Sequence, residues 1–222
     1  MSGLDRLEFV EPADIEARSF EIIDRELAER LGGRRLDPGT EPVVKRVIHT
    51  SADFEYADTL VFSPGAVDIG VEALRGGCPV VTDTKMAAAG INKRVLGRFG
   101  GEVLNFISDP DVVEEARARG LTRSAVSMER AAARHTPLIY AVGNAPTALV
   151  RLYEMLQAQT LDPLPVLIVG VPVGFVNVVE SKELIGELDV PHIVARGRKG
   201  GSNVAAAIVN ALLYLASDDE RV

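Results

Sequence analysis

The chain has 222 residues, of which 47% are apolar, and this suits one large domain with a sizeable core better than two small domains. Its net charge of -8 argues against a general affinity for nucleic acid or an anionic membrane, whose phosphates an acidic surface repels. The single cysteine, Cys78, excludes an intrachain disulfide and a cysteine-based metal site.

The hydropathy of the sequence indicates neither an export signal nor a membrane-spanning segment. The N-terminal sequence MSGLDRLEFVEPADIE lacks the basic region and apolar core of a signal peptide. The most apolar run, from Pro163 to Val179, is uncharged, but prolines and glycines interrupt it and it is slightly too short to span a bilayer. We therefore expect a cytoplasmic protein.

The first predicted element is a helix over residues 12–33, with Pro12 near its start and a glycine pair as its stop. Its apolar face is formed by Ile15, Ile22, Ile23, Leu27 and Leu31. Ser19 is the polar member of this face, and its commonest explanation is a hydrogen bond to the carbonyl four residues earlier. The alternative is that its hydroxyl contacts a ligand.

The segment R-V-I-H-T-S, residues 46–51, contains the histidine best placed for proton transfer. Val43, Val44, Val47 and Ile48 follow helical spacing, which favours a helix over a strand. On a helix Arg46 and His49 share a face, whereas on a strand they would point to opposite faces. At the end of a helix, the helix dipole favours the protonated form of His49, whereas the positive charge of Arg46 disfavours it. The structural alternative is that His49 only caps the helix.

Six short apolar runs rich in β-branched residues then predict six strands. They span residues 59–63, 78–83, 102–108, 137–142, 165–170 and 191–196. Nearly continuous apolar runs are typical of strands covered on both faces, and helical segments separate most of them. We therefore predict an α/β fold for residues 1–222, a single-domain, doubly wound, mostly parallel sheet with helices on both faces. Ligands in such sheets bind at the carboxyl ends of the strands.

The turns after five strands are predicted to form a wide cleft floor that suits anions. They span residues 62–70, 82–90, 143–148, 170–176 and 196–203, and four carry glycine at the turn. The alternative for each is that a strand-to-helix turn needs Gly or Pro for backbone reasons alone. Basic residues expected at the same rim are Arg46, Lys85, Arg123, Arg196, Arg198 and Lys199.

Common cofactor and catalytic motifs are absent from the sequence, including G-x-G-x-x-G, the P-loop, H-E-x-x-H and G-x-S-x-G. Three histidines far apart in sequence make a histidine-rich metal site improbable. His192 lies within an apolar strand, which predicts a hydrogen-bonded core residue, and His135 is expected at a helix end as a cation. His49 is left as the single candidate acid.

Several motifs together resemble the precorrin-8X methylmutase family of cobalamin biosynthesis. They are R-V-I-H-T, T-L-V-F-S-P, G-N-A-P-T-A-L, V-G-F-V-N-V-V-E-S-K and G-R-K-G-G-S, in that order over nearly the whole chain. R-S-F in the first helix is similar too, and the polar run S-A-D-F-E-Y-A-D after His49 is the main variation.

This resemblance implies an isomerase that moves a methyl group from C-11 to C-12 of a corrin precursor by a 1,5-shift. The product would be hydrogenobyrinate, or cobyrinate in the cobalt-containing route. His49 matches the family's catalytic histidine, whose implied role is to protonate the macrocycle during the rearrangement. Ser19 and Arg46 match substrate-contacting positions, and Arg123 matches an arginine of the same cleft. The resemblance also implies a homodimer without a separate cofactor or metal.

The expected ligand is a wide apolar disc fringed with carboxylates, which needs an open apolar cleft with backbone donors and guanidinium groups. Phe175 and Val176 are predicted to press on this disc, although exposed loop aromatics often only pack. The predicted substrate-binding set is Ser19, Arg46, Arg123, Lys85, Asn144, Gly174, Phe175, Val176, Arg198, Gly200, Gly201 and Ser202. The rival predictions are a non-catalytic corrinoid carrier and an α/β enzyme that binds a phosphate ligand.

Overall fold

A six-stranded sheet lies at the centre of the protein in the computed structural model, which describes residues 8–217. The strands are β1 (Leu60–Phe62), β2 (Val80–Thr82), β3 (Val103–Leu104), β4 (Ile139–Val142), β5 (Leu167–Gly170) and β6 (His192–Ala195). Their order in the sheet is β1-β6-β5-β4-β2-β3. Every residue of β2, β4, β5 and β6 is buried, as expected for apolar runs covered on both faces. All six predicted strands are confirmed.

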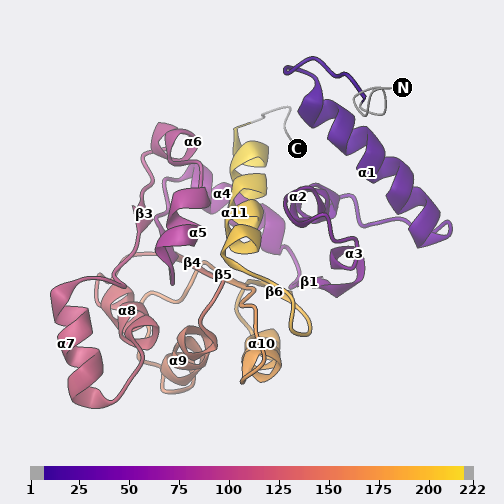
Figure 1. Cartoon of the computed structure of the whole chain (residues 1–222). Coiled ribbons are helices and arrows are strands. Elements are labelled where there is room, and N and C mark those ends of the chain that lie inside the picture. Colours follow the sequence, from indigo (N-terminus) through magenta and orange to yellow (C-terminus); the bar gives the residue numbers. More distant parts are fainter. Residues whose placement is uncertain (1–7, 218–222) are drawn as a thin grey trace, which may run out of the picture.

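Helices cover both faces of the sheet, which confirms the predicted doubly wound α/β architecture (Figure 1). One layer contains α2 (Glu41–Ser51), α4 (Ala66–Arg75), α5 (Lys85–Gly90), α6 (Lys93–Arg98) and α11 (Ser202–Ala216). The other contains α7 (Pro110–Arg119), α8 (Arg123–Ala132), α9 (Pro146–Gln157) and α10 (Val178–Gly186). The short helix α3 (Tyr56–Thr59) leads into β1.

The edge strand β1 runs antiparallel to β6, while the other neighbouring pairs are parallel. The carboxyl end of β1 therefore lies beside the amino ends of the other strands, and the turn after β1 lies opposite the other strand-to-helix turns. Ser63 exchanges hydrogen bonds with His192 at the amino end of β6, with distances of 2.8 and 3.0 Å. The prediction that residues 62–70 join the cleft floor is thus wrong, because an apolar run does not specify the direction of its strand.

The C-terminal helix α11 is the centre of its layer. It packs against α2, α4 and α5, and it is apolar around most of its circumference. Its small residues allow close approach, since a Cβ added at Gly90 of α5 would lie 2.8 Å from that of Ala206. The position of α2 therefore depends on the last helix of the chain.

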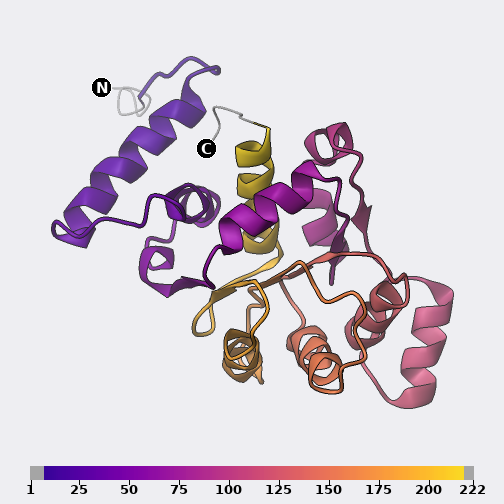
Figure 2. The same cartoon turned by 180° about the vertical axis from the view of Figure 1, so that it is seen from behind.

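The first helix, α1 (Ile15–Leu31), lies apart from the sheet and packs mainly against α2, as both views show (Figures 1 and 2). Gly32 ends it with φ of 58°, which agrees with the predicted glycine stop. Ile23 and Leu27 are buried, but Ile15 is 52% exposed. In residues 8–217 no helix combines the length and apolarity needed to cross a membrane.

Candidate functional site

His49 lies in the last turn of α2, so the helical prediction for this segment is confirmed. Its half-buried ring stacks on Phe20 of α1, with centroids 5.2 Å apart and planes inclined by 17°. The guanidinium carbon of Arg46 lies 4.8 Å from the centroid of the same phenyl ring. Arg46 and His49 therefore share a helix face, as predicted, and α1 covers that face.

Arg46 is almost fully buried, with 6% of its surface exposed. Its guanidinium lies between Phe20 and Tyr214, and Nη1 donates to the Glu16 carboxylate at 2.5 Å. Nε and Nη2 have no hydrogen-bond partner in residues 8–217. Buried donors without partners are costly, so the buried charge of this guanidinium is only partly compensated by Glu16.

The surroundings of His49 favour its neutral form. Burial lowers its pKa below the ordinary value of 6.5, the positive charge of Arg46 lowers it further, and Glu16 acts in the opposite direction. The helix-end effect expected from the sequence is therefore outweighed, chiefly by burial. In the described part of the chain neither ring nitrogen of His49 forms a hydrogen bond, which leaves both available to a ligand.

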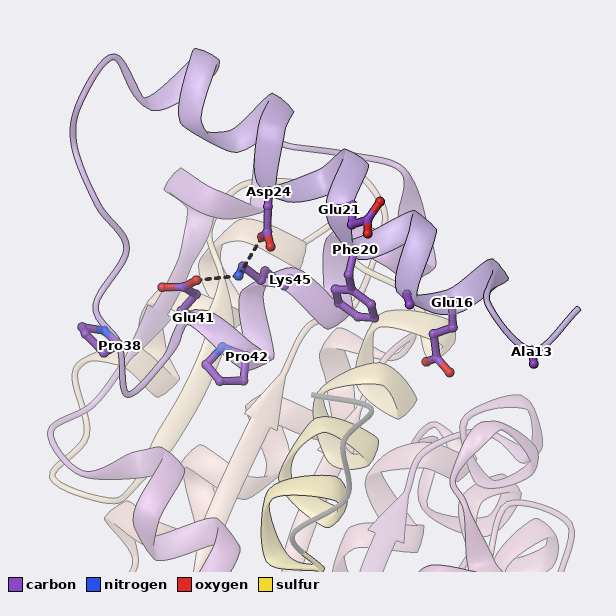
Figure 3. Close-up of a pocket in the computed structure, with 10 residues that line it drawn as sticks. Ala13, Glu16, Phe20, Glu21, Asp24, Pro38, Glu41, Pro42 and Lys45 are labelled. Atoms are coloured by element: carbon purple, nitrogen blue, oxygen red, sulfur yellow. Dashed lines mark ion pairs between the residues drawn. The ribbon is translucent and has the colours of Figure 1, made fainter. Parts of the chain in front are cut away.

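A groove of about 690 Å³ lies between α1 and α2, with Phe20 among its lining residues (Figure 3). Its charged lining is mostly acidic and comprises Glu16, Glu21, Asp24, Glu41 and Lys45. The one ammonium is already paired, at 2.7 Å with Asp24 and 2.6 Å with Glu41. Such a lining repels a polycarboxylate, and His49 is not part of it.

The remaining glycine turns meet at the carboxyl edge of the sheet. Gly201 donates to the Val171 carbonyl at 2.8 Å, and Gly174 donates to the Arg198 carbonyl at 3.1 Å. A Cβ on Gly200 would lie only 2.1 Å from the Val171 oxygen, so this position excludes any side chain. Here the backbone explanation of the glycines holds, because the two turns press directly on each other.

A buried lysine, which the sequence did not single out, fixes the same turns. Lys182 of α10 is 2% exposed and donates to the carbonyls of Gly197 and Lys199 at 2.9 and 2.8 Å. Burial lowers its pKa to about 8. The motif around Phe175 contains this lysine, but only the folded structure shows that its amine reaches the next strand-to-helix turn.

Asp83 is a second residue that the sequence did not single out. It is fully buried and accepts hydrogen bonds from the amides of Gly143, Asn144 and Ala145 at 2.9, 2.8 and 2.7 Å. Burial raises its pKa, against the effect of these three donors. The N-terminus of α9 therefore binds a carboxylate of the protein itself. An acidic residue directly after the buried run V-V-T was the available signal.

Exposed apolar side chains surround these turns. Phe175 and Val176 are 82% and 78% exposed, and Met86 next to Lys85 is 72% exposed. The guanidinium of Arg198 lies 5.4 Å from the Phe175 ring centroid. Asn144 and Lys85 are exposed, whereas the Ser202 hydroxyl is buried and bonded to that of Thr84 at 2.8 Å. We call this region the carboxyl-edge surface: residues 85–86, 144, 173–176 and 198–202.

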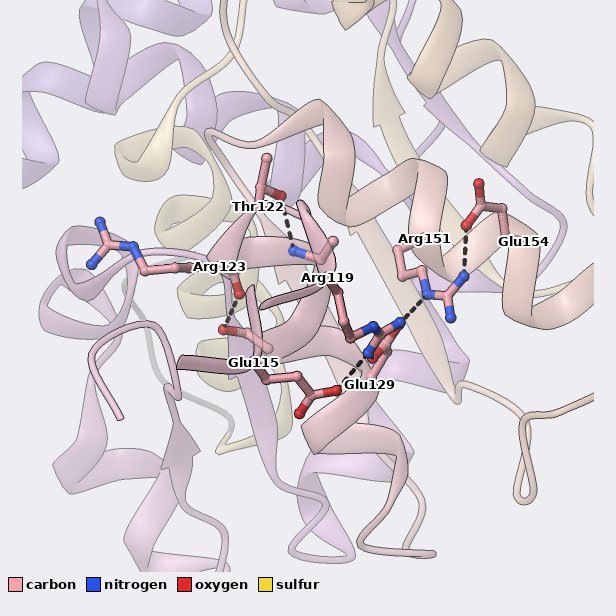
Figure 4. A network of polar contacts seen from close by, with 9 residues as sticks. Glu115, Arg119, Thr122, Arg123, Glu129, Arg151 and Glu154 are labelled. Atoms are coloured by element: carbon pink, nitrogen blue, oxygen red, sulfur yellow. Dashed lines mark hydrogen bonds and ion pairs between the residues drawn. The ribbon is translucent and has the colours of Figure 1, made fainter. Parts of the chain in front are cut away.

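Arg123 lies at the start of α8, next to this surface. The Thr122 hydroxyl meets that of Thr147 in the first turn of α9 at 2.7 Å. Figure 4 shows the Arg123 side chain pointing away from the network in which Glu129 pairs with Arg119 and Arg151. Within residues 8–217 no carboxylate pairs with Arg123, so its charge is available.

The predicted site residues thus form two groups, which Lys199 connects. Its amine pairs with Asp53 at 2.6 Å and Glu55 at 2.8 Å, in the loop that follows α2. Arg46 and His49 belong to the α1–α2 group, with Ser19 beside Phe20 in sequence. The Ser19 hydroxyl donates to the Ile15 carbonyl at 2.8 Å, which confirms the local explanation of this serine. The other ten predicted contacts belong to the carboxyl-edge surface or adjoin it.

Comparison with known proteins gives consistent matches over most of the chain. A family model described as precorrin-8X methylmutase matches residues 14–215. The cobalt-precorrin-8 methylmutase of Salmonella typhimurium is 50% identical, covering 92% of this chain and 95% of the relative. That of Priestia megaterium is 44% identical, covering 93% and 89%. The crystal structure of precorrin-8X methylmutase from Thermus thermophilus matches with a TM-score of 0.82 and 41% identity, covering 92% of this chain and 98% of that one.

Proposed function

Because this chain belongs to the precorrin-8X methylmutase family, and is thus a methyl-shifting isomerase of cobalamin biosynthesis, we propose that His49 is its proton donor. The reaction we assign is the transfer of a methyl group from C-11 to C-12 of a corrin precursor by a 1,5-shift. The methyl group stays within one molecule, so the protein need only hold the ring, deliver a proton and shield an electron-deficient intermediate. A positioned general acid contributes about 10²- to 10⁴-fold to such a step.

The observation that carries this proposal is the environment of His49. Its ring is half-buried, its nitrogens have no hydrogen-bond partner in the described chain, and the loop after its helix is tied to the carboxyl edge through Lys199. The imidazole is held neutral by burial and by Arg46 in the free protein. A ligand fringed with carboxylates reverses that balance, because nearby negative charge raises the pKa of histidine. Substrate binding thus charges the donor.

We place the corrin disc on the carboxyl-edge surface. Phe175 and Val176 supply exposed apolar area for its face. The carboxylates at the rim of the disc pair with the cations Lys85, Arg123 and Arg198. The remaining proposed contacts with the substrate come from Asn144 and from the turns that contain Gly174, Gly200, Gly201 and Ser202. Arg46 and Ser19 act from the His49 side, where the incompletely paired charge of the Arg46 guanidinium attracts a substrate carboxylate.

The cobalt-containing substrate is the first to test, since the relatives from Salmonella typhimurium and Priestia megaterium are named cobalt-precorrin-8 methylmutases. We further propose that the enzyme is a homodimer that works in the cytoplasm. A chain with one buried, free cysteine suits a reducing compartment. Sedimentation equilibrium measures the assembly directly.

The decisive experiment compares His49→Ala with His135→Ala. Both remove an imidazole, but His135 lies at the far end of α8 from Arg123, with its Nδ1 3.1 Å from the Asp162 carbonyl oxygen. We expect His49→Ala to abolish conversion of the precursor in a single-turnover absorbance assay while it still binds the tetrapyrrole. His135→Ala should convert normally. Near-normal conversion by His49→Ala would remove His49 from the chemistry.

A further inference from the structure

The orientation of His49 is not set in the usual way. A catalytic imidazole is commonly held by a hydrogen bond from one ring nitrogen, so that the other nitrogen points at the substrate. In residues 8–217 no carbonyl or carboxylate accepts from His49. The ring contact with Phe20 is the interaction that restricts its plane. Centroids 5.2 Å apart and planes at 17° correspond to offset stacking, a favourable geometry for aromatic pairs.

Phe20 is itself held from several sides. It projects from α1 toward α2 in Figure 3, and it packs against the core as a partly buried residue. The guanidinium carbon of Arg46 lies 4.8 Å from the centroid of the Phe20 ring. Arg46 in turn contacts the Tyr214 ring and donates to the Glu16 carboxylate. These contacts form one stack from α11 through α2 and α1 to the imidazole. A change in the Phe20 ring therefore acts directly on His49.

From this stack we propose that Phe20 is a positioning residue that aims the His49 imidazole at the corrin ring, an inference that rests on the proposed role of His49. Phe20 takes no part in the chemistry. It fixes the ring plane, and thereby the line along which the proton leaves. Because proton transfer needs a short, aligned path, a small error of aim lowers the rate of the chemical step rather than the affinity for substrate.

The test uses three variants. Phe20→Leu removes the stacking ring and keeps an apolar side chain, and Phe20→Tyr restores a ring. Phe99→Leu is the control, since Phe99 is also partly buried against the core but lies at the end of α6, outside both groups of predicted site residues. We expect Phe20→Leu to lower kcat about 10- to 100-fold with KM changed less than about threefold. Phe20→Tyr should recover most of kcat, and Phe99→Leu should leave it unchanged.

NMR of the His49 ring protons provides a readout that general loosening of the fold would not reproduce. Stacking on a phenyl ring shifts these resonances upfield, so Phe20→Leu should move them downfield while Phe20→Tyr and Phe99→Leu leave them in place. A wild-type kcat in Phe20→Leu, an equal loss in Phe99→Leu, or unchanged His49 resonances would each overturn the proposal. Its failure is distinct from that of the proton donor, because His49→Ala reports on the donor alone.

Discussion

At the scale of single residues, the charge on Arg46 opposes protonation of His49. Replacing it, in Arg46→Met, should therefore raise the His49 pKa, and NMR titration of the imidazole measures this. A proton donor works only when protonated, so kcat/KM of the wild type should fall as pH rises through a value below 6.5, the ordinary value from which the pKa is lowered. In Arg46→Met that fall should move to higher pH.

Lys45→Met is the matched control for this prediction. It removes the same charge from the same helix, but Lys45 faces Asp24 and Glu41 in the acidic groove and is not among the causes of the His49 shift. An equal change in His49 pKa in both variants would mean that Arg46 has no special influence on the imidazole.

Arg123 should contribute to binding rather than to the chemical step. Its exposed guanidinium has no carboxylate partner in the described chain. We expect Arg123→Ala to weaken corrinoid binding by about 1 to 3 kcal/mol, the usual range for a charged hydrogen bond that is partly desolvated. Arg130→Ala is the control. Arg130 lies on the same helix as Arg123 but already pairs with Asp111 of α7, so its removal should have little effect on binding. Equal affinities in an equilibrium absorbance titration would exclude Arg123 from the site.

Local rules predicted some of these residues and missed others. The bond from Ser19 to Ile15 spans one helical turn, so sequence spacing was enough to predict it. Phe20 is the next residue, yet its contact with His49 joins two helices, and no periodicity within α1 indicates it. Asp83 and Lys182 were missed for the same reason, because their partners lie in other strand-to-helix turns.

At the scale of elements, Asp83 connects β2 to the start of α9. Its carboxylate accepts three backbone hydrogen bonds, and an amide presents only one oxygen to the same donors. Asp83→Asn should therefore lower the free energy of unfolding by about 1 to 3 kcal/mol, measured by denaturant titration. Amide exchange at Gly143, Asn144 and Ala145 should also become faster.

Asp109→Asn provides the comparison, since Asp109 precedes α7 but its side chain makes no capping hydrogen bond. Its stability should stay within about 0.5 kcal/mol of the wild type. If the two variants lost stability equally, the three amide bonds to Asp83 would have no special weight.

All six strands and the two N-terminal helices could be predicted because each has a strong apolar pattern and clear turn residues at its ends. The direction of β1 could not. Its side chains would be buried equally well in either orientation, and the choice is made by pairing with β6 and by the bonds between Ser63 and His192. The error about residues 62–70 follows directly from this missing information.

At the scale of the whole molecule, two layers of helices enclose the sheet while α1 extends from one side (Figure 2). The class of fold followed from the alternation of apolar strands with helical segments. The link between the loop after α2 and the last glycine turn did not, because it depends on the pairing of Lys199 with Asp53 and Glu55. Nothing in the sequence around Lys199 or around that loop indicates this pairing.

The pairing of β1 with β6 has a consequence for biosynthesis. The partner strand of β1, and the helix α11 against which α2 packs, are synthesised long after β1 and α2 themselves. In a nascent chain α2 and β1 must therefore wait for these later elements before they can dock. A chain truncated after Pro191 should be cleaved rapidly by protease before residue 62, whereas the full chain resists. The residue proposed to deliver the proton would thus be among the last to reach its working place, which keeps unfinished chains inactive.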